Sequence, residues 1–458
     1  MFDDIDASPL GRFHFRNIIV NGMGVFSDSY NLYAFSLVYY TAIQYLSMNR
    51  AQVSVVTAAS YYGAALGALL FGVLADRIGR KPMYGIDLAL IFIGSLTQLF
   101  IFNFSSLFVS RFVMGFGIGG DYVMSPVIMA ENSNVRDRGK LMATTFSIMF
   151  LLGATLAAFV LQVGSGLLPA AISWRVVLAF GSVPALFVIY YRRKIPETER
   201  FMVRVRGKAP QPASQDGHSD VVSPGKDTVP FRSRLRRSMP LILAGSVLWV
   251  LYDTYSSTFT IYGPITIAAN LGLSAVGFTY AAVFLAGIPG TLLSLFLIDR
   301  VGRRKLVTVG YAGVFLALVL FAMLELNPSI LGLPGADRLA SGLVGIAALA
   351  GFVFYLLNYL FSSLGPGTII GGTILVPEVI PTKVRASGQA INVSIDRFAS
   401  ALAITSFPTL LLAFGLGYIV LVYAAIAIIS SAIVLTAFPE SRGRNLEEVS
   451  KEVSSPES

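Results

Sequence analysis

Long apolar runs alternate with short polar stretches along the whole chain. A helix of about 20 apolar residues crosses the hydrocarbon layer of a bilayer, and we place twelve such spans. They cover approximately residues 17–42, 53–75, 83–103, 106–130, 140–163, 171–191, 239–268, 275–298, 306–326, 341–378, 387–413 and 415–437. The pattern predicts an all-α membrane protein with 12 transmembrane helices.

The composition supports this prediction. The 458 residues are 55% hydrophobic and only 13% charged, whereas soluble domains carry about 25% charged residues. There are no cysteines, and the two histidines, His14 and His218, lie outside the predicted spans. We therefore expect no metal site and no cofactor. We also expect no enzyme activity, because the sequence contains no constellation of nucleophile or metal ligands.

The net charge of +9 reflects topology rather than nucleic-acid binding. Most Lys and Arg residues fall in the termini and in the loops that follow even-numbered spans. By the positive-inside rule, both termini are cytoplasmic. Residues 1–16 are acidic and mixed, so we expect no cleavable signal peptide. The prediction is an integral protein of the plasma membrane that contacts the lipid bilayer and no nucleic acid.

A polar stretch rich in Pro and Ser divides the chain into halves of six spans each. We expect the middle of this stretch to be disordered. The predicted units are an N-terminal six-helix bundle (1–191), a cytoplasmic linker (192–238), a C-terminal six-helix bundle (239–438) and a cytoplasmic tail (439–458).

Three motifs occur once in each half, in the same order. Asp-Arg-x-Gly-Arg occupies 76–80 and 299–303, and Pro-Glu follows the sixth span of each half. A glutamate also ends the fourth span of each half, with an arginine seven residues later. This order indicates a duplicated six-helix unit. Such repeats place the substrate site between the halves, near the midplane of the membrane.

Residues 72–81, Gly-Val-Leu-Ala-Asp-Arg-Ile-Gly-Arg-Lys, resemble the loop 2–3 signature of the major facilitator superfamily. Residues 377–385 and 439–444 resemble signatures shared by its sugar porters and phosphate porters. The resemblance covers the whole chain and implies the major facilitator fold, two pseudo-symmetric six-helix bundles. It also favours a gating role for loop charges that lock helix ends together, although they could simply be solvated charges that fix topology. The candidates are Asp76, Arg77, Arg80, Glu131, Arg138, Asp299, Arg300, Glu378 and Arg385.

Charged residues inside the spans are the candidates for chemistry. Asp28, Asp121 and Asp253 lie well inside spans 1, 4 and 7, and Asp87 lies near the inner end of span 3. A charge at such depth costs at least a few kcal/mol and suggests function by default. Buried carboxylates without an intramembrane histidine favour carboxylate-borne proton coupling. The alternative is that each is a structural partner, bonded to a Ser, Tyr or Arg of another helix.

Gly-Gly-Asp-Tyr at 119–122 resembles the span-4 signature of the phosphate:proton symporters. Residues 27–32, Tyr84 with Asp87, and Trp249 with Asp253 resemble that family in spans 1, 3 and 7. The resemblance implies proton-path roles for Asp28, Asp87, Asp121 and Asp253. It implies a substrate pocket that includes Asn31, Tyr122, Trp249, Asp253, Ser257 and Arg397.

The substrate contacts of that family are less complete than its proton path. Its Gly-Pro-Asn in span 10 is Gly-Pro-Gly at 365–367, and its span-5 glutamine has no counterpart. Ser257 replaces a tyrosine of span 7. Asp396-Arg397 replaces Gly-Lys of span 11, which keeps a cation and adds an acid. Gly-Pro-Gly should also bend span 10 near a cavity or hinge.

We therefore expect a secondary active transporter that carries a small solute with protons by alternating access, as a monomer. Inorganic phosphate is the expectation from the family. Two alternatives stay open: an organic carboxylate or sugar, and a transport-dead nutrient sensor. The absence of the Gln-Gln pair of sugar porters from span 7 disfavours a sugar. The short tail after residue 440 disfavours a sensor.

Overall fold

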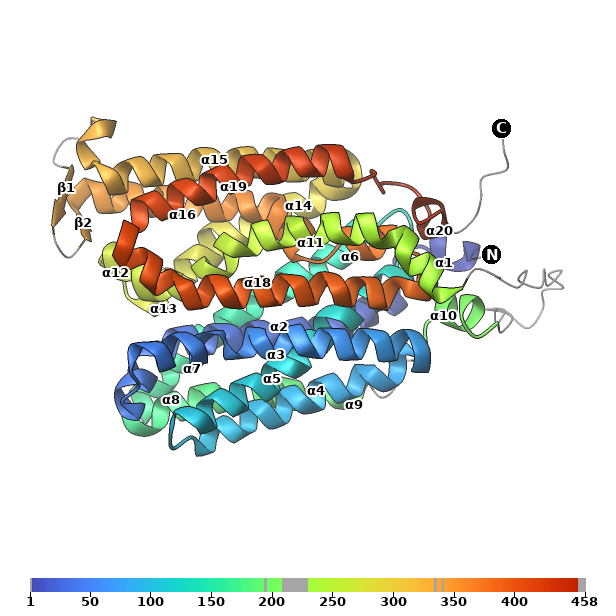
Figure 1. Cartoon of the computed structure of the whole chain (residues 1–458), viewed down its shortest axis with the longest axis horizontal. Coiled ribbons are helices and arrows are strands. Elements are labelled where there is room, and N and C mark those ends of the chain that lie inside the picture. The colour runs from blue at the N-terminus through green and yellow to red at the C-terminus, as the bar shows by residue number, and fades with distance from the viewer. Residues whose placement is uncertain (1, 193–195, 208–229, 333–335, 340–341, 452–458) are drawn as a thin grey trace.

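Long helices lie side by side along the molecule and form two groups that follow the two halves of the chain (Figure 1). The structure is a computed structural model, and it describes residues 2–192, 196–207, 230–332, 336–339 and 342–451. The first group consists of α2 (Arg12–Leu46), α3 (Arg50–Ile78), α4 (Arg80–Thr97), α5 (Phe104–Glu131), α6 (Arg138–Ala143), α7 (Met149–Leu167), α8 (Ala170–Ala179) and α9 (Ser182–Arg192).

The second group repeats this order of helices. It consists of α11 (Phe231–Tyr262), α12 (Ala268–Asn270), α13 (Ala275–Ala281), α14 (Ile288–Val301), α15 (Arg303–Leu326), α16 (Gly345–Leu364), α17 (Leu375–Val379), α18 (Arg385–Phe414) and α19 (Leu416–Ala437). Short π-helical segments join α6 to α7, α11 to α12 and α13 to α14.

Ten helical segments of the described chain are long and apolar enough to cross a membrane. α2 and α11, with 35 and 32 residues, lie alongside them and complete the predicted set (Figure 1). Both are less apolar, because buried polar residues are spread along α2 and α11 begins with several arginines. The predicted all-α membrane fold is therefore confirmed.

Some helix boundaries differ from the sequence pattern. α9 continues through Arg192, and α11 starts at Phe231, whereas the predicted linker spans 192–238; its residues 193–195 and 208–229 lie outside the described chain. The predicted start of span 10 at residue 341 is too early. An antiparallel hairpin of β1 (Ala336–Leu339) and β2 (Gly342–Val344), with Asp337 opposite Val344, precedes α16.

The predicted break in span 10 is confirmed. α16 ends at Leu364, directly before Gly365 and Pro366. A π-helical segment, Gly367–Gly371, and a short turn then lead to α17. Proline removes one helix hydrogen bond and clashes with the preceding turn, which accounts for the interruption.

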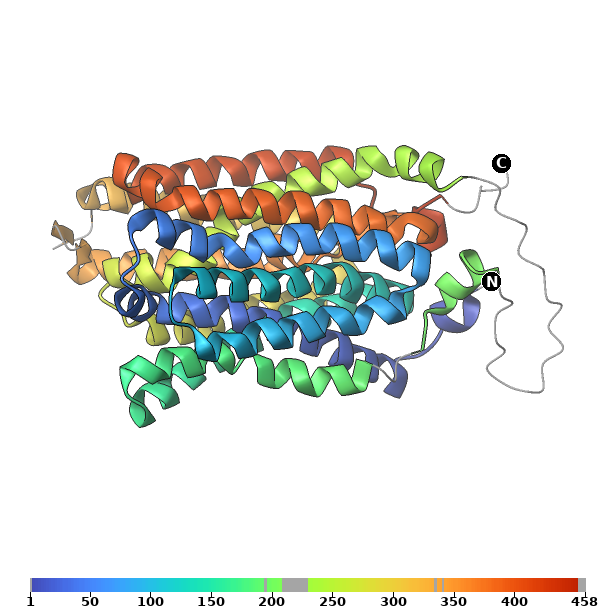
Figure 2. The ribbon, with the colours of Figure 1, turned by 60° about the horizontal axis from the view of Figure 1, so that its bottom comes forward.

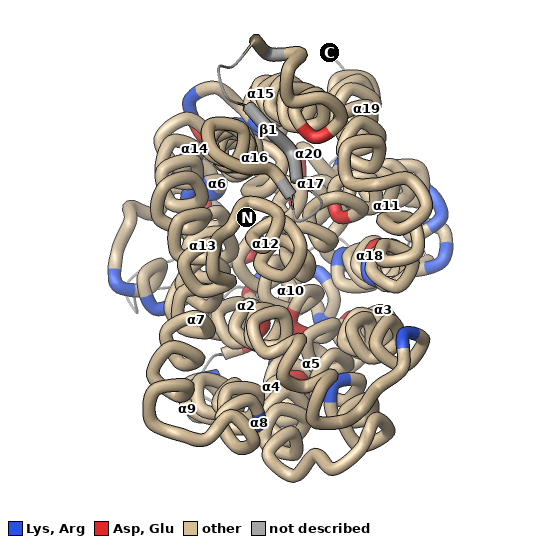
Figure 3. The backbone as a smooth tube through the Cα atoms, turned by 90° about the vertical axis from the view of Figure 1, so that its left-hand side faces the viewer, with Lys and Arg blue, Asp and Glu red and all other residues tan. Residues whose placement is uncertain are grey.

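Glycines allow α3 and α5 to pack closely. A Cβ at Gly115 or Gly119 would collide with the backbone carbonyl of Ser60 or Ala64 on α3. The glycine-rich stretch of α5 is therefore a helix-packing face. On its other side, α3 packs along α18 of the second half, and α2 contacts α11. Figure 3, viewed along the helices, shows α2 and α3 of the first group and α18 of the second where the two groups meet.

Both termini lie at the same end of the bundle (Figure 1). We call this end the termini face. Three short helices lie there: α1 (Asp3–Asp6), α10 (Glu199–Arg204) and α20 (Leu446–Val449). Figure 2 shows α1 and α10 beyond the ends of the long helices.

Candidate functional site

Arg192, the last residue of α9, holds two acids of the first half together. Its Nη1 lies 3.0 Å from Oδ2 of Asp87, and its Nη2 lies 2.6 Å from Oδ1 of Asp121. Asp28 of α2 is fully buried beside them; no N–H or hydroxyl group of the described residues donates to its carboxyl oxygens, which face the Asp121 carboxyl group. We call these four residues the first-half cluster. One cation faces three acids, so bound protons are needed to bring the cluster near neutrality.

Three residues around this cluster, Gly24, Tyr84 and Ser125, hold Arg192 in place. A Cβ at Gly24 of α2 would collide with the guanidinium of Arg192, and it would lie 2.5 Å from the Asp121 carboxylate. The ring of Tyr84 lies 3.7 Å from the Arg192 guanidinium. Ser125, one turn after Asp121, donates a hydrogen bond of 2.6 Å to that carboxylate. The arginine is therefore fixed between an aromatic face and the acids.

Arg397 of α18 holds a second group of acids. Its Nη1 lies 2.9 Å from Oδ2 of Asp253 on α11, and its Nε lies 3.6 Å from Oδ2 of Asp396. Asp396 is fully buried, and no N–H or hydroxyl group in the described part of the chain donates to its oxygens, which face the Asp253 carboxyl group. The guanidinium also lies 4.3 Å from the ring centre of Tyr122 and 5.2 Å from that of Trp249. We call Asp253, Asp396 and Arg397 the second-half cluster.

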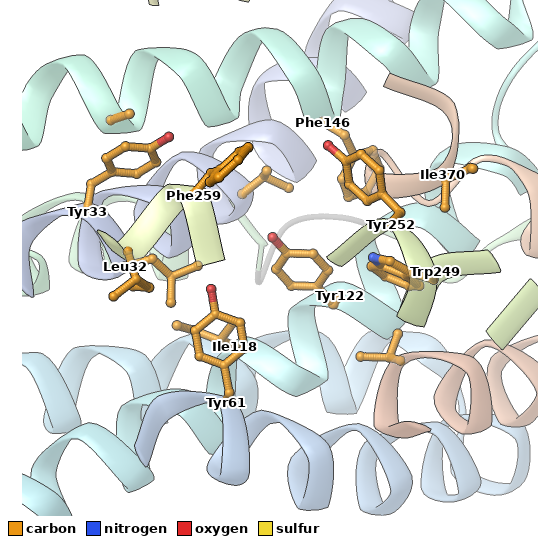
Figure 4. Close-up of a cluster of buried hydrophobic side chains, with 14 of the residues drawn as sticks. Leu32, Tyr33, Tyr61, Ile118, Tyr122, Phe146, Trp249, Tyr252, Phe259 and Ile370 are labelled. Atoms are coloured by element: carbon orange, nitrogen blue, oxygen red, sulfur yellow. The ribbon is translucent and has the colours of Figure 1, made fainter. Parts of the chain in front are cut away.

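A cavity of about 100 Å³ lies between the two halves. Pockets that hold drug-sized ligands measure about 300–1,000 Å³, so this one suits a small solute. Figure 4 shows Tyr122 between Tyr61, Trp249 and Tyr252, all of which line the cavity. Further polar lining comes from Ser147, Asp253, Ser256, Ser257, Thr260, Thr291, Tyr359, Ser362, Ser363, Thr368 and Arg397.

The two clusters are placed differently relative to this cavity. Asp253 and Arg397 of the second-half cluster belong to its wall, whereas the four residues of the first-half cluster do not. The second-half cluster can therefore contact a solute directly. The first-half cluster lies in the helix packing of its own half.

Tyr252 explains the glycine at position 367. A Cβ at Gly367 would lie 2.9 Å from the Tyr252 hydroxyl and 2.9 Å from the carbonyl oxygen of Ser362. A larger side chain at this position would compete with Tyr252 for this space. The Tyr252 hydroxyl itself lies 3.4 Å from the Ser362 hydroxyl, and both residues line the cavity. A phenolic hydroxyl thus occupies the space beside Gly367.

Most residues predicted to bind substrate lie in the cavity wall, namely Tyr122, Trp249, Asp253, Ser257 and Arg397. Asn31 lies elsewhere. Its Nδ2 donates to the carbonyl of Ser27, and its Oδ1 accepts a hydrogen bond of 2.8 Å from Ser95. The structure thus places Asn31 in the packing between α2 and α4, away from the cavity lining.

Glu131, at the end of α5, contacts arginines of both halves. Its carboxylate lies 2.9 Å from Arg385 of the second half and 3.3 Å from Arg80 of the first. Nearby, the Asp76 carboxylate accepts a hydrogen bond of 2.6 Å from the backbone N–H of Ser387 on α18. These contacts join the two halves at the termini face.

The second half repeats this arrangement. Glu378 of α17 lies 2.9 Å from Arg138 of the first half and 2.9 Å from Arg303 of its own half. The Asp299 carboxylate accepts hydrogen bonds of 3.1 and 2.9 Å from the backbone N–H groups of residues 139 and 140. The gating candidates therefore form two related networks, each crossing from one half to the other.

Two gating candidates, Arg77 and Arg300, are exposed instead. Arg303, which the sequence analysis omitted, is the counterpart of Arg80. The repeated Asp-Arg-x-Gly-Arg motif contains the signal for it, because Arg80 and Arg303 both end the motif.

The halves also touch at the end opposite the termini face. The Ser36 hydroxyl of α2 donates to the carbonyl of Ile261 on α11. The Tyr280 hydroxyl donates a hydrogen bond of 3.0 Å to Gln162. Contacts between the halves thus lie on both sides of the cavity.

A third group of one arginine and two acids lies outside the spans. Arg200 of α10 is 2.6 Å from Asp6 and 2.9 Å from Glu447 of α20. We call these three residues the clasp. Burial favours a higher pKa for Glu447, but Arg200 outweighs it and holds that pKa below the ordinary value. Burial raises the pKa of Asp6 despite Arg200.

Arg192 is the main site residue that the sequence analysis did not include. It directly follows predicted span 6, where an arginine is an ordinary positive-inside charge. No spacing pattern relates it to Asp87 or Asp121, which are distant in sequence. In the described residues, no group of three His, Asp or Glu side chains could hold a metal ion.

Comparison with solved structures defines the class of protein. The fold matches XylE, a major facilitator proton:xylose symporter, bound to 6-bromo-6-deoxy-D-glucose, with a TM-score of 0.78. The two chains are 18% identical, with 96% of this chain and 99% of XylE covered. The inward open form of XylE from E. coli gives a TM-score of 0.66 at 17% identity and the same coverage. The protein is a membrane protein with the major facilitator fold.

The pattern of the family "Sugar (and other) transporter" matches residues 22–453, so the chain belongs to this family of transporters. A probable inorganic phosphate transporter 1-6 of Arabidopsis thaliana is 28% identical, with 98% of this chain and 95% of the relative covered. Inorganic phosphate transporter 1-1 of Oryza sativa subsp. japonica is also 28% identical, with 98% and 96% covered. The predicted resemblance is confirmed.

Proposed function

We propose that this transporter carries a small anion together with protons, and that inorganic phosphate is its leading substrate. The observation that carries the proposal is the buried pair of Arg397 and Asp253 in the cavity wall. A guanidinium presents several N–H donors in a planar fork that suits an oxyanion. The names of the relatives support phosphate.

Proton coupling is supported by the first-half cluster. Three acids surround one arginine in a fully buried site, and a carboxyl in such a site can bind and release a proton. Asp28 is the candidate carrier, because its oxygens have no donor in the described chain while Asp87 and Asp121 pair with Arg192. The XylE neighbour is named a proton symporter.

In alternating access, the networks at the termini face would act as a gate. We place the termini face on the cytoplasmic side of the membrane. We also propose that the protein works as a monomer in the plasma membrane. Opening toward the cytoplasm requires the Glu131–Arg385 and Glu378–Arg138 pairs to separate. A bound solute must then supply differential contacts that make up for their loss.

A second candidate is an organic carboxylate or a sugar. It is favoured by the aromatic residues of the cavity wall, Tyr61, Tyr122, Trp249 and Tyr252. The Tyr252 hydroxyl beside Gly367 also favours it, because a hydroxyl can bond an organic solute. Aromatic faces pack well against the apolar faces of an organic solute. The xylose neighbour shares only the fold.

The test is uptake of labelled phosphate into proteoliposomes under an imposed inward proton gradient. We expect accumulation that a protonophore abolishes and that unlabelled phosphate or arsenate competes, while sugars and carboxylates do not. Empty liposomes give the background. Competition by a carboxylate or sugar, without phosphate uptake, would replace phosphate by an organic solute. Uptake that ignores the proton gradient would contradict the coupling.

A further inference from the structure

Asp396 is a buried acid next to Arg397, a residue of the cavity wall. It is 0% exposed, and no N–H or hydroxyl group of the described residues donates to its oxygens, which face the Asp253 carboxyl group. Its nearest cation, Arg397, contacts it only at 3.6 Å because the guanidinium is directed to Asp253 at 2.9 Å. One arginine therefore faces two carboxyl groups, and an ionised Asp396 would be an uncompensated buried charge.

The charged and titratable groups around Asp396 and Arg397 come from α3, α5, α11 and α18. Asp253 of α11 and Arg397 of α18 are its charged neighbours, and Tyr61 of α3 is a further titratable neighbour. Tyr122 of α5 covers the guanidinium. Two facing carboxyl groups beside one cation are most stable when they share a proton.

An anion in the cavity makes this requirement stronger. If both acids stayed ionised, an anion bound to Arg397 would bring three negative charges to one positive charge. A proton on Asp396 removes one of them without displacing Asp253 or Arg397.

We propose that Asp396 carries a second proton, which enters with the anion and leaves with it on the other side. This inference rests on the proposed function, since it assumes an anion at Arg397 and one proton in the first-half cluster. The transporter then moves at least two protons for each anion. Neutralising Asp396 permanently removes one proton from the cycle but leaves Asp253 and Arg397 in place.

The experiment measures how far phosphate accumulates in proteoliposomes when the membrane potential is clamped at zero. Each coupled proton multiplies the equilibrium accumulation of the phosphate monoanion by about 10 for a gradient of one pH unit, because a tenfold ratio corresponds to about 1.4 kcal/mol. The wild type should reach about 100-fold. Asp396→Asn should reach only about 10-fold, and the conservative Asp396→Glu should return to about 100-fold.

Exchange of internal for external phosphate, without a gradient, shows that each variant is folded and cycles. Asp396→Gly serves as a second neutral variant if the asparagine is not tolerated. Equal accumulation by wild type and Asp396→Asn would overturn the inference, and so would loss of exchange in both neutral variants. A wild-type accumulation of only about 10-fold would overturn it without any variant. Failure of the wild type to accumulate phosphate in any gradient would overturn the proposed function itself.

Discussion

The first-half and second-half clusters are built from the same parts and placed differently. In each, a buried arginine pairs with aspartate while another aspartate, Asp28 or Asp396, receives no hydrogen bond from an N–H or hydroxyl group in the described chain. Asp253 and Arg397 of the second-half cluster lie in the cavity wall and Arg397 contacts aromatic rings, whereas the first-half cluster is enclosed by its own half. The same arrangement of charges can therefore serve substrate binding where the solute reaches the arginine, and proton coupling where it does not.

The comparison separates binding from coupling. A cation that lines the cavity can be shared between an acid and a substrate anion, so binding changes its pairing directly. A cation outside the cavity responds only to protons and to helix movement. Changes in the second-half cluster should thus affect substrate affinity and coupling together, and changes in the first-half cluster should affect coupling alone.

The largest effect is expected for Asp121→Asn. The neutral amide loses the 2.6 Å ion pair with Arg192, and the first-half cluster can no longer bind and release its proton in a full cycle. Net accumulation in a proton gradient should be abolished even with Asp396 intact, because a first-half cluster that cannot exchange its proton stops the empty carrier from returning. Exchange of internal for external substrate, which needs no empty return, should continue. Uptake and exchange of labelled substrate in the same proteoliposomes give the two readings. Full uphill uptake by this variant would contradict the role of the first-half cluster.

Arg397→Ala should weaken transport of an anion by about 100-fold, because losing one partner of a buried charge pair costs about 2–5 kcal/mol. Uptake of a neutral solute should fall much less. Arg397→Lys is the matched control, since it keeps the charge and loses the planar fork. Concentration-dependent uptake distinguishes a loss of affinity from a loss of turnover. Equal uptake of the anion by the alanine variant would show that Arg397 does not bind it.

These two tests address residues that the sequence indicates on its own. A charge inside an apolar run is conspicuous, so Asp121, Asp253 and Arg397 are found by hydropathy alone. The two-half fold is found the same way, since the spans and the repeated loop motifs lie in the printed sequence. These features are visible because each depends on neighbours close in the chain.

Arg192 is different, because its importance depends on which helices meet. It follows a span, as many topology-setting arginines do. Only the packing of α9 against α2 and α4, with α4 packed on α5, brings it to the acids. The same holds for the glycine that makes room for it. Distances between helices, rather than propensities within one helix, decide such contacts.

Gly24→Ala tests this packing with a smaller expected effect. The added methyl group would collide with the Arg192 guanidinium, and overpacking of a core costs about 1–3 kcal/mol. We expect a lower thermal stability and a reduced accumulation ratio, with substrate affinity unchanged. Gly85→Ala on α4 is the matched control, because a Cβ there meets nothing within 4 Å. Identical behaviour of the two variants would show that Arg192 does not need its observed position.

The smallest effect is expected in the clasp. The clasp tests whether burial alone, or the paired arginine, decides the charge state of a buried acid. It contains one arginine and two acids, as the second-half cluster does, but outside the spans. The pKa of Glu447 lies below its ordinary 4.5 because Arg200 outweighs burial. A carboxyl with a lowered pKa stabilises the fold above its ordinary pKa, and this contribution disappears as the pH falls through the lowered value.

Glu447→Gln should therefore lower the free energy of unfolding by about 1–2 kcal/mol at neutral pH. The difference from the wild type should shrink as the pH falls below 4.5. Asp6→Asn is the control, and it should cost less, because burial raises the pKa of Asp6 and the ionised form gains little from folding. Thermal unfolding of detergent-solubilised protein across this pH range supplies the measurement. An Asp6→Asn effect as large as that of Glu447→Gln would mean that Arg200 stabilises both acids equally. By analogy, the single arginine of the second-half cluster could then stabilise both Asp253 and Asp396, and the contrast between these two aspartates would lose its physical basis.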